Sequence, residues 1–151
     1  VVTNLTADNG AFYSAEDADT EGEEGKFYVW SIKELDSILN KDEAAFVKHT
    51  FNLRDEGNFN DEATGQKTGQ NIFYLSEQLS KDKQAQWKAI RKTLAKSRKK
   101  RTKPGLDDKI LTDWNGLMIG ALAEAGRLLN DASFITLAEK AISFIDSPSQ
   151  S

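Results

Sequence analysis

Six carboxylates crowd into nine residues near the start of the chain. They are Glu16, Asp17, Asp19, Glu21, Glu23 and Glu24. Like charges at this density repel one another, so the segment requires cations, hydrogen-bond donors or full contact with water. One interpretation is a solvated tip between two strands, and another is a cation site.

The cation hypothesis starts from the order Asp17, Asp19, Glu21, Gly22, which matches the first half of an EF-hand calcium loop. The match fails at the twelfth position, where Tyr28 stands in place of the bidentate glutamate. The flanking residues also favour strands over helices. Asp17, Asp19 and Glu21 are therefore weak metal candidates, and the sequence as a whole predicts no metal site.

A second group of polar and aromatic residues flanks the start of the strongest predicted helix. Its members are Asp107, Asp108, Lys109, Asp113, Trp114 and Asn115. Carboxylates near a helix N-terminus are stabilised by its dipole by about 0.3–1 kcal/mol. Trp114 could stack on a sugar ring, and Asn115 or Asp108 could bind its hydroxyls. The alternative is a structural role, in helix capping and in ion pairs with Arg98 and Arg101.

Several classes of site are excluded by residues that the sequence lacks. The chain has no cysteine, which excludes disulfides, thiolate catalysis and cysteine–zinc sites within it. It has one histidine, His49, predicted to be an exposed helical residue. No phosphate-binding glycine loop and no Gly-x-Ser-x-Gly elbow occur, and no cofactor is expected.

Length and charge narrow the class of protein further. The 151 residues fit one folded domain, and the net charge of −4 gives no reason to expect nucleic acid or an anionic membrane as partner. The basic run 96–103 has no interleaved aromatic residue and predicts a solvated helix end with some inward arginines. No apolar stretch is long enough to span a membrane. A polar start without methionine or signal peptide indicates a fragment, and we expect a cytoplasmic location.

The N-terminal two thirds predict a hairpin followed by three helices. Aromatic residues at 12–13 and 27–30 predict a β-hairpin over 10–30 with an acidic tip. Ser31 and Glu34 form a capping-box pattern before a short helix, and a second follows Asp42. A glycine-containing loop over 54–70, an extended segment over 71–75 and a polar helix over 81–99 complete this part.

The C-terminal third predicts a helical pair. The helix over 113–129, capped by Thr112 or Asp113, is apolar nearly all round and should be buried. Gly116 and Gly120 share one face, which predicts a closely packed neighbour. Asp131 should cap a last helix that is apolar on one side and ends at Pro148. Such an inner and outer pair is the repeating unit of an α/α toroid. In all we expect five helices, with strands only near 11–30 and 70–75.

Three segments carry a resemblance to a known family: GAFYSAEDADTEGEEGKFYVWS (10–31), GNF (57–59) and RKKRTKPGLDDKILTDWNGLMIGALAEAGRLL (98–129). They resemble the YyaL-like, or spermatogenesis-associated protein 20-like, family. Its members join a thioredoxin-like domain to an α/α barrel similar to six-hairpin glycosidases and N-acylglucosamine 2-epimerases. The resemblance implies a mainly α chain, 1–151, that forms one fragment of an (α/α)6 toroid with an accessory β-hairpin. Its parts would be the hairpin 10–30, a helical part 31–100 and the helix pair 104–147. The thioredoxin-like domain is absent from this chain.

The same resemblance implies a carbohydrate-binding or carbohydrate-processing barrel that uses carboxylate chemistry. In that scheme Asp107, Asp108 and Asp17 are the candidate catalytic residues, and the acidic tip is a lid over the barrel mouth. The candidate substrate-binding residues are Trp114, Asn115, Asp113, Lys109 and Glu16. The epimerases use a histidine pair, which the lone His49 cannot supply. Two alternatives remain: a non-catalytic module that partners the thioredoxin-like domain and the rest of the barrel, and a cation-binding acidic hairpin. Barrel edges cut in this fragment should expose apolar helix faces, through which a homodimer could form.

Overall fold

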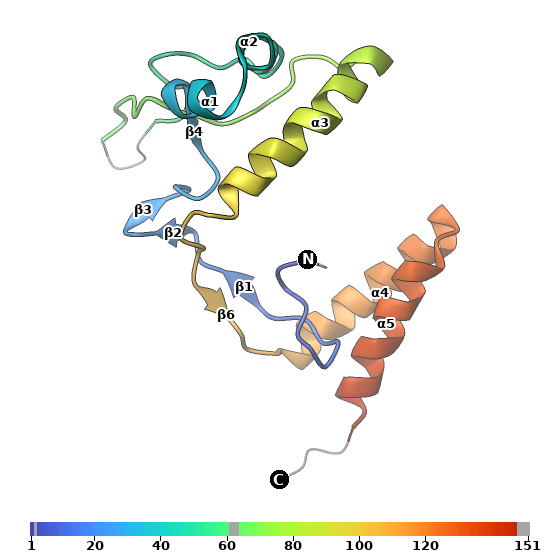
Figure 1. Cartoon of the computed structure of the whole chain (residues 1–151). Coiled ribbons are helices and arrows are strands. Elements are labelled where there is room, and N and C mark those ends of the chain that lie inside the picture. Colours follow the sequence, from blue (N-terminus) through green and yellow to red (C-terminus); the bar gives the residue numbers. More distant parts are fainter. Residues whose placement is uncertain (2, 61–63, 148–151) are drawn as a thin grey trace. The chain divides into compact units, whose positions relative to one another are not determined.

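The computed structural model describes residues 1, 3–60 and 64–147 (Figure 1). This part of the chain is mainly helical, and its five helices agree with the number expected. They are α1 (Ile32–Ile38), α2 (Lys41–Thr50), α3 (Lys81–Arg98), α4 (Thr112–Leu129) and α5 (Ala132–Ile145). The chain divides into two compact units, the first made of 1–17 and 105–151 and the second of Ala18–Pro104.

Short antiparallel strand pairs accompany the helices. In the first unit β1 (Ala15–Glu16) pairs with β6 (Leu106–Asp107). In the second unit β2 (Asp19–Thr20) pairs with β3 (Glu23–Glu24), and β4 (Trp30–Ser31) pairs with β5 (Gln70–Asn71). The extended segment expected over 71–75 therefore contributes only its first residue to a strand, and the strand β6 was not expected.

The hairpin predicted over 10–30 is wrong in its extent. Phe12 forms an isolated bridge with Thr6 and does not pair with the segment 27–30. The reason is that the two aromatic clusters enter different cores: Phe12 lies in the core of the first unit and Trp30 in that of the second. Only the acidic tip forms a hairpin, β2–β3. Glu21 and Gly22 at its turn both have positive φ, 56° and 77°, as a two-residue type I′ turn requires.

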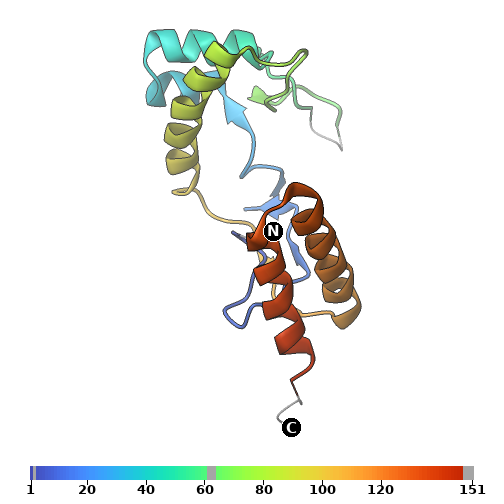
Figure 2. The same ribbon diagram turned by 90° about the vertical axis from the view of Figure 1, so that its right-hand side faces the viewer.

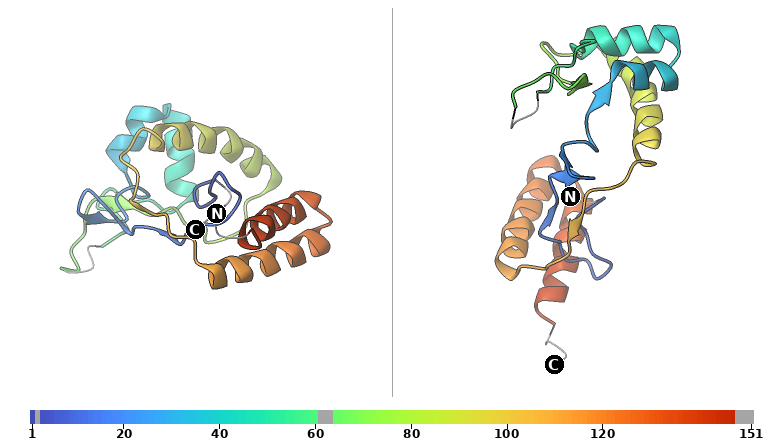
Figure 3. Two further views of the ribbon diagram at one scale, coloured as in Figure 1. Left: turned by 90° about the horizontal axis from the view of Figure 1, so that it is seen from below. Right: turned by 90° about the vertical axis from the view of Figure 1, so that its left-hand side faces the viewer.

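The core of the second unit forms where α1, α2 and α3 meet (Figure 3). The Ser31 hydroxyl accepts from the Glu34 N–H and starts α1, as predicted, and Asn40 starts α2 in a reciprocal capping box. Buried apolar side chains from the three helices and their flanks then pack together. They are Trp30, Leu35, Leu39, Ala44, Val47, Phe51, Ile90 and Leu94. The core thus fixes the end of α3 beside the start of α1.

In the first unit α4 and α5 lie side by side, joined by a tight turn at Asn130 (Figures 1 and 2). Phe12, Leu122, Ala138 and Ala141 form the core of this unit. Asp131 caps α5 by accepting from the Ser133 N–H, as predicted. The cap expected for α4 is wrong, because Leu111 occupies that position and supplies no side-chain hydrogen bond. Pro148, the expected stop of α5, lies outside the residues that the structure describes.

The expected burial of α4 on all sides is also wrong for this chain. Trp114, Leu117 and Leu128 are 52%, 76% and 65% exposed. A Cβ added at Gly116 or Gly120 would meet nothing within 4 Å, so no described residue supplies the close neighbour predicted there. Among the described residues α4 therefore carries a stripe of exposed apolar side chains.

The close helix contact lies at Gly126 instead. A Cβ there would approach the Ile135 side chain to 2.6 Å and the Asp131 carbonyl oxygen to 3.3 Å. We therefore expect Gly126→Ala to lower the stability of the first unit by about 1 kcal/mol, since overpacking outweighs the gain in helix propensity. Gly120→Ala, its matched control in open space, should raise stability by up to about 1 kcal/mol. Calorimetric melting of the three proteins measures both, and equal effects of the two substitutions would contradict this packing.

Candidate functional site

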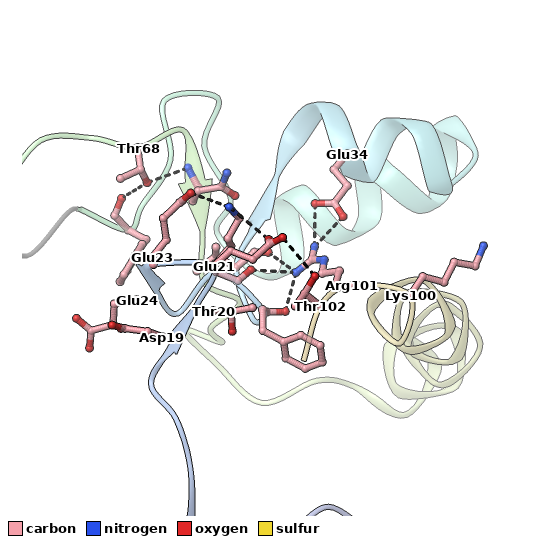
Figure 4. Close-up of a pocket in the computed structure, with 16 residues that line it drawn as sticks. Asp19, Thr20, Glu21, Glu23, Glu24, Glu34, Thr68, Lys100, Arg101 and Thr102 are labelled. Atoms are coloured by element: carbon pink, nitrogen blue, oxygen red, sulfur yellow. Dashed lines mark hydrogen bonds and ion pairs between the residues drawn. The ribbon is translucent and has the colours of Figure 1, made fainter. Parts of the chain in front are cut away.

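A cleft of about 1000 Å³ opens in the second unit beneath the acidic hairpin (Figure 4). It is bounded by the β2–β3 hairpin, the segment that leads to β4, the start of α1, the loop before β5 and the residues after α3. Its polar lining includes Asp19, Thr20, Glu21, Glu23, Glu24, Lys26, Glu34, Thr68, Gln70, Lys100, Arg101 and Thr102. Phe27, Val29 and Phe59 add apolar surface. Such a mixture of carboxylates, donors and aromatic rings is suited to a polar organic ligand.

Arg101 fixes the floor of this cleft. Its guanidinium binds both carboxylate oxygens of Glu34, at 2.7 and 2.8 Å. It also donates to the carbonyl oxygens of Phe27 and Val29, at 2.7 and 2.9 Å, and lies 4.0 Å from the centre of the Trp30 ring. One side chain thus joins the end of α3 to α1 and to the segment 27–30. This confirms the prediction of an inward arginine within the basic run.

The Glu34 carboxylate also corrects the capping-box prediction. Ser31 does accept from the Glu34 N–H, but the Glu34 side chain extends to Arg101. The reciprocal bond of a capping box therefore gives way to a charge-assisted, bidentate ion pair, which is the stronger interaction.

Lys26 neutralises part of the acidic hairpin. Its ammonium lies 2.7 Å from Glu23 and 3.5 Å from Glu21. The hydrogen bond to Glu23 raises the pKa of Lys26 above its ordinary value, so the ammonium stays charged. Thr102 donates to Glu21 across 3.3 Å. The hairpin is therefore attached to the rest of the second unit by hydrogen bonds and ion pairs.

The other predicted site residues belong to the first unit. Glu16 lies in β1, Asp17 directly follows it, and Asp107 lies opposite in β6. The Asp17 N–H donates to the Gly105 carbonyl oxygen at 2.7 Å, which continues this strand pair. Asp108, Asp113 and Trp114 are exposed. Residues 16–17 and 107–115 therefore lie in the same unit, and none of them lines the cleft described above.

Asp107 and Lys109 form a local ion pair, with the ammonium 2.7 Å from both carboxylate oxygens. These hydrogen bonds from Lys109 hold the pKa of Asp107 below its ordinary value of 3.8. The ion pair therefore keeps the Asp107 carboxylate charged and makes it a weaker base than an unpaired aspartate, because its pKa moves away from neutral pH.

The lowered pKa of Asp107 can be tested by titration. We expect carbon-detected NMR to give Asp107 a pKa below 3.8, and Lys109→Met to raise it towards that value. Since the folded-state pKa lies below the unfolded one, any stabilisation by this pair is present above the unfolded pKa and is lost as the pH falls through the folded pKa. Lys103→Met serves as the matched control and should leave the titration unchanged.

Asn115 is a structural residue in this fold. It is 1% exposed, and its side-chain oxygen accepts from the Phe12 N–H at 2.8 Å. Its amide nitrogen donates to the carbonyl oxygens of Phe12 and Leu111, at 2.9 and 3.0 Å. The side chain is therefore occupied by backbone groups, and the predicted substrate-binding role of Asn115 finds no support in this geometry.

Removal of the Asn115 side-chain amide should destabilise the first unit, because Asn115→Ala leaves the buried N–H and C=O of Phe12 without partners. We expect the stability of the first unit to fall by about 2 kcal/mol. Hydrogen exchange at the Phe12 amide measures the change directly, and Asp113→Ala, one exposed position in the same helical turn, is the control. Unchanged exchange at Phe12 would contradict this role.

Sequence reasoning missed several cleft residues, namely Thr20, Glu34, Phe59, Thr68 and Gln70. Thr20 and Phe59 lie in the segments that carried the family resemblance, which is a signal that could have found them, whereas Glu34, Thr68 and Gln70 lie outside those segments. Within the described ranges no group of three His, Asp or Glu side chains is arranged to hold a metal ion, so the cation hypothesis gains no support. His49 is exposed, as predicted. No helix among the described residues is both long and apolar enough to cross a bilayer.

Comparison with known proteins finds clear relatives. The chain is 31% identical over 96% of its length to spermatogenesis-associated protein 20 of Rattus norvegicus and of Homo sapiens. It is 26% identical over 91% of its length to the uncharacterized protein B0495.5 of Caenorhabditis elegans. In each case the chain spans only 22% of the relative's length. No family model matches the chain.

Proposed function

The chain belongs to the family of spermatogenesis-associated protein 20, and we propose that it is a segment of an α/α toroid that contributes a carbohydrate-binding cleft. The observation that carries this proposal is the cleft of the second unit, which places carboxylates, threonine hydroxyls and two phenylalanine rings around about 1000 Å³. Sugars are bound in proteins by such groups, because hydroxyls need both donors and acceptors and ring faces need apolar contact. The pairing of α4 with α5 supports the toroid, since antiparallel helix pairs are its repeating unit.

The floor of the cleft suits this role because Arg101 holds it rigidly. A bidentate ion pair and two carbonyl contacts leave the guanidinium no freedom to move with the ligand. Binding sites gain affinity from such preorganisation, since less conformational entropy is lost on binding. Catalysis by Asp107, Asp108 and Asp17 stays a prediction. Asp113, Trp114, Lys109 and Glu16 stay candidate substrate contacts in the first unit.

A thermal-shift screen of the full-length protein against a library of mono- and disaccharides tests the proposal. We expect at least one sugar to raise the melting temperature in a concentration-dependent manner. Glu23→Gln, in the cleft lining, should weaken the shift, whereas Glu139→Gln, exposed on α5, should leave it unchanged. A library without any hit, or a hit insensitive to Glu23→Gln, would remove the cleft from consideration.

A second candidate function is that of a non-catalytic partner module, and the exposed apolar stripe of α4 favours it. Trp114, Leu117 and Leu128 share one face of this helix, and Leu129 is also exposed. Faces of this kind are buried in protein–protein or interdomain contacts. The partner would be the remainder of the barrel, the thioredoxin-like domain or a second copy of the chain. Small-angle scattering of this chain over a concentration series tests the last of these cases, because self-association through α4 would be abolished by Leu117→Lys.

A further inference from the structure

One face of α3 is strongly positive, on the side of the helix away from the core of the second unit (Figure 1). Its cations follow one another at intervals of four, four and three residues, so they lie on one side of the helix. They form a lysine stripe made of Lys88, Lys92, Lys96 and Lys99. All four are exposed, and none lines the cleft described above.

The lysine stripe has no anionic partner among the described residues. None of its members forms an ion pair or a side-chain hydrogen bond there. Elsewhere in the same unit Lys26, Lys48 and Lys67 are each paired with a carboxylate. The helix itself contains a single acidic residue, Asp82, near its start. The positive charge of the stripe is therefore left uncompensated by its surroundings.

This arrangement costs the helix stability. Like charges four residues apart repel each other on a helix surface. The helix dipole favours cations in the last turn, which accounts for Lys96 and Lys99. It does not account for Lys88 and Lys92, which precede the last turn and repel each other. An anionic partner would remove this repulsion.

We propose that the lysine stripe is a docking surface for an extended, acidic segment of a partner polypeptide. Residues four apart on a helix are separated by a rise of about 6 Å. Alternate side chains of an extended strand lie on one face about 6.6 Å apart. Carboxylates at every second position of such a segment therefore meet successive lysines, and the flexible lysine side chains absorb the small difference in spacing.

Other polyanions fit this surface less well. Single-stranded nucleic acids are bound by stacking on aromatic rings, and bases are read by bidentate arginines, but the stripe contains neither. Membrane-surface helices insert an apolar face into the bilayer, whereas the apolar side of α3, with Ile90 and Leu94, is occupied by the core. The net charge of −4 also opposes association with a long polyanion.

Fluorescence anisotropy of the full-length protein with a labelled peptide tests the inference. In the probe, four aspartates alternate with serines. We expect it to bind at low ionic strength and to lose about tenfold in affinity between about 20 and 200 mM salt. An isomeric peptide with its four aspartates in one block has the same charge. It should bind about threefold more weakly, because consecutive side chains of a strand point to opposite faces.

A pair of double variants separates the stripe from net charge. Lys92→Gln combined with Lys96→Gln should weaken binding of the alternating peptide about fivefold. Its melting temperature should not fall, because a repulsion is removed. Lys33→Gln combined with Lys41→Gln removes the same charge from exposed positions outside the stripe and should leave the affinity unchanged. Equal weakening by the two double variants would overturn the assignment to the stripe.

Two further probes test the class of partner. Labelled oligothymidine and vesicles that contain phosphatidylserine should bind more weakly than the alternating peptide under the same conditions. Tighter binding of either probe would overturn the choice of a polypeptide partner. Absence of binding by all three probes would overturn the docking surface itself.

Discussion

Replacement of Arg101 by methionine should lower the stability of the second unit by about 3 kcal/mol. The substitution keeps most of the length of the side chain but leaves the Glu34 carboxylate and the carbonyl oxygens of Phe27 and Val29 without their donor. Both members of the ion pair are largely shielded, with side chains 20% and 35% exposed, so water replaces the lost bonds incompletely. Urea unfolding in a Trp114→Phe background measures the change, because the remaining two tryptophans, Trp30 and Trp87, both lie in the second unit.

Arg98→Met is the matched control for this experiment. Arg98 is the last residue of α3, and its guanidinium lies 5.6 and 5.5 Å from the ring centres of Phe27 and Tyr28, with no ion pair to any described residue. Cation–π contacts of this kind contribute about 0.5–1 kcal/mol. If the two substitutions had equal effects, the Arg101 network would contribute nothing beyond its ring contact. Because Arg101 also lines the cleft, we expect Arg101→Met, and not Arg98→Met, to abolish the sugar-induced thermal shift.

Gly57→Ala should destabilise the second unit by about 3 kcal/mol or more. Gly57 has a φ of +85°, and an added Cβ would lie 2.5 and 2.7 Å from the backbone oxygen and nitrogen of Gln70. These atoms cannot move aside easily, because the Gln70 carbonyl oxygen accepts from the N–H groups of Asn58 and Phe59. Urea unfolding in the same tryptophan background gives the free energy, and the loop that carries Phe59 and Gln70 into the cleft should be lost with it.

Gly69→Ala distinguishes the two causes of the destabilisation expected for Gly57→Ala, which are backbone strain at positive φ and the steric clash with Gln70. Gly69 has a similar φ of +72°, but a Cβ there would meet nothing within 4 Å. Its substitution therefore costs only the left-handed backbone strain, about 1 kcal/mol. If Gly57→Ala were as mild as Gly69→Ala, the close approach of the chain to Gln70 would be refuted.

The helices could be predicted from sequence because their signals are local. Ser31 and Asp131 act as caps with donors two or three residues away, and apolar spacing marks the buried face of each helix. The burial of α4 could not be predicted, because an apolar residue such as Leu117 is buried only where a partner exists. Likewise, strand propensity at Phe12 and Trp30 gave no information about which of two cores each side chain enters.

The site was predictable in its acidic half only. Clustered carboxylates are visible in the sequence, and the hairpin over 19–24 does line the cleft. Its other half depends on contacts between distant residues. Glu34 and Arg101 are 67 positions apart, and the spacing of Glu34 from Ser31 favoured a capping role over an ion pair. No periodic pattern in the sequence predicts the Glu34–Arg101 ion pair, because the two residues meet only after packing of the core has placed α3 beside α1.

The division of the chain into a continuous and a discontinuous unit has a consequence for folding during synthesis. All residues of the second unit leave the ribosome as one uninterrupted stretch, so this unit can fold before α4 and α5 exist. Phe12 cannot reach its folded position at that stage. The side chain of Asn115, which binds the Phe12 backbone, is synthesised 103 residues later. At usual rates of translation this delay lasts roughly 5–20 s. During that interval the segment that carries Phe12 lacks its partners in α4 and α5, and this apolar side chain stays uncovered.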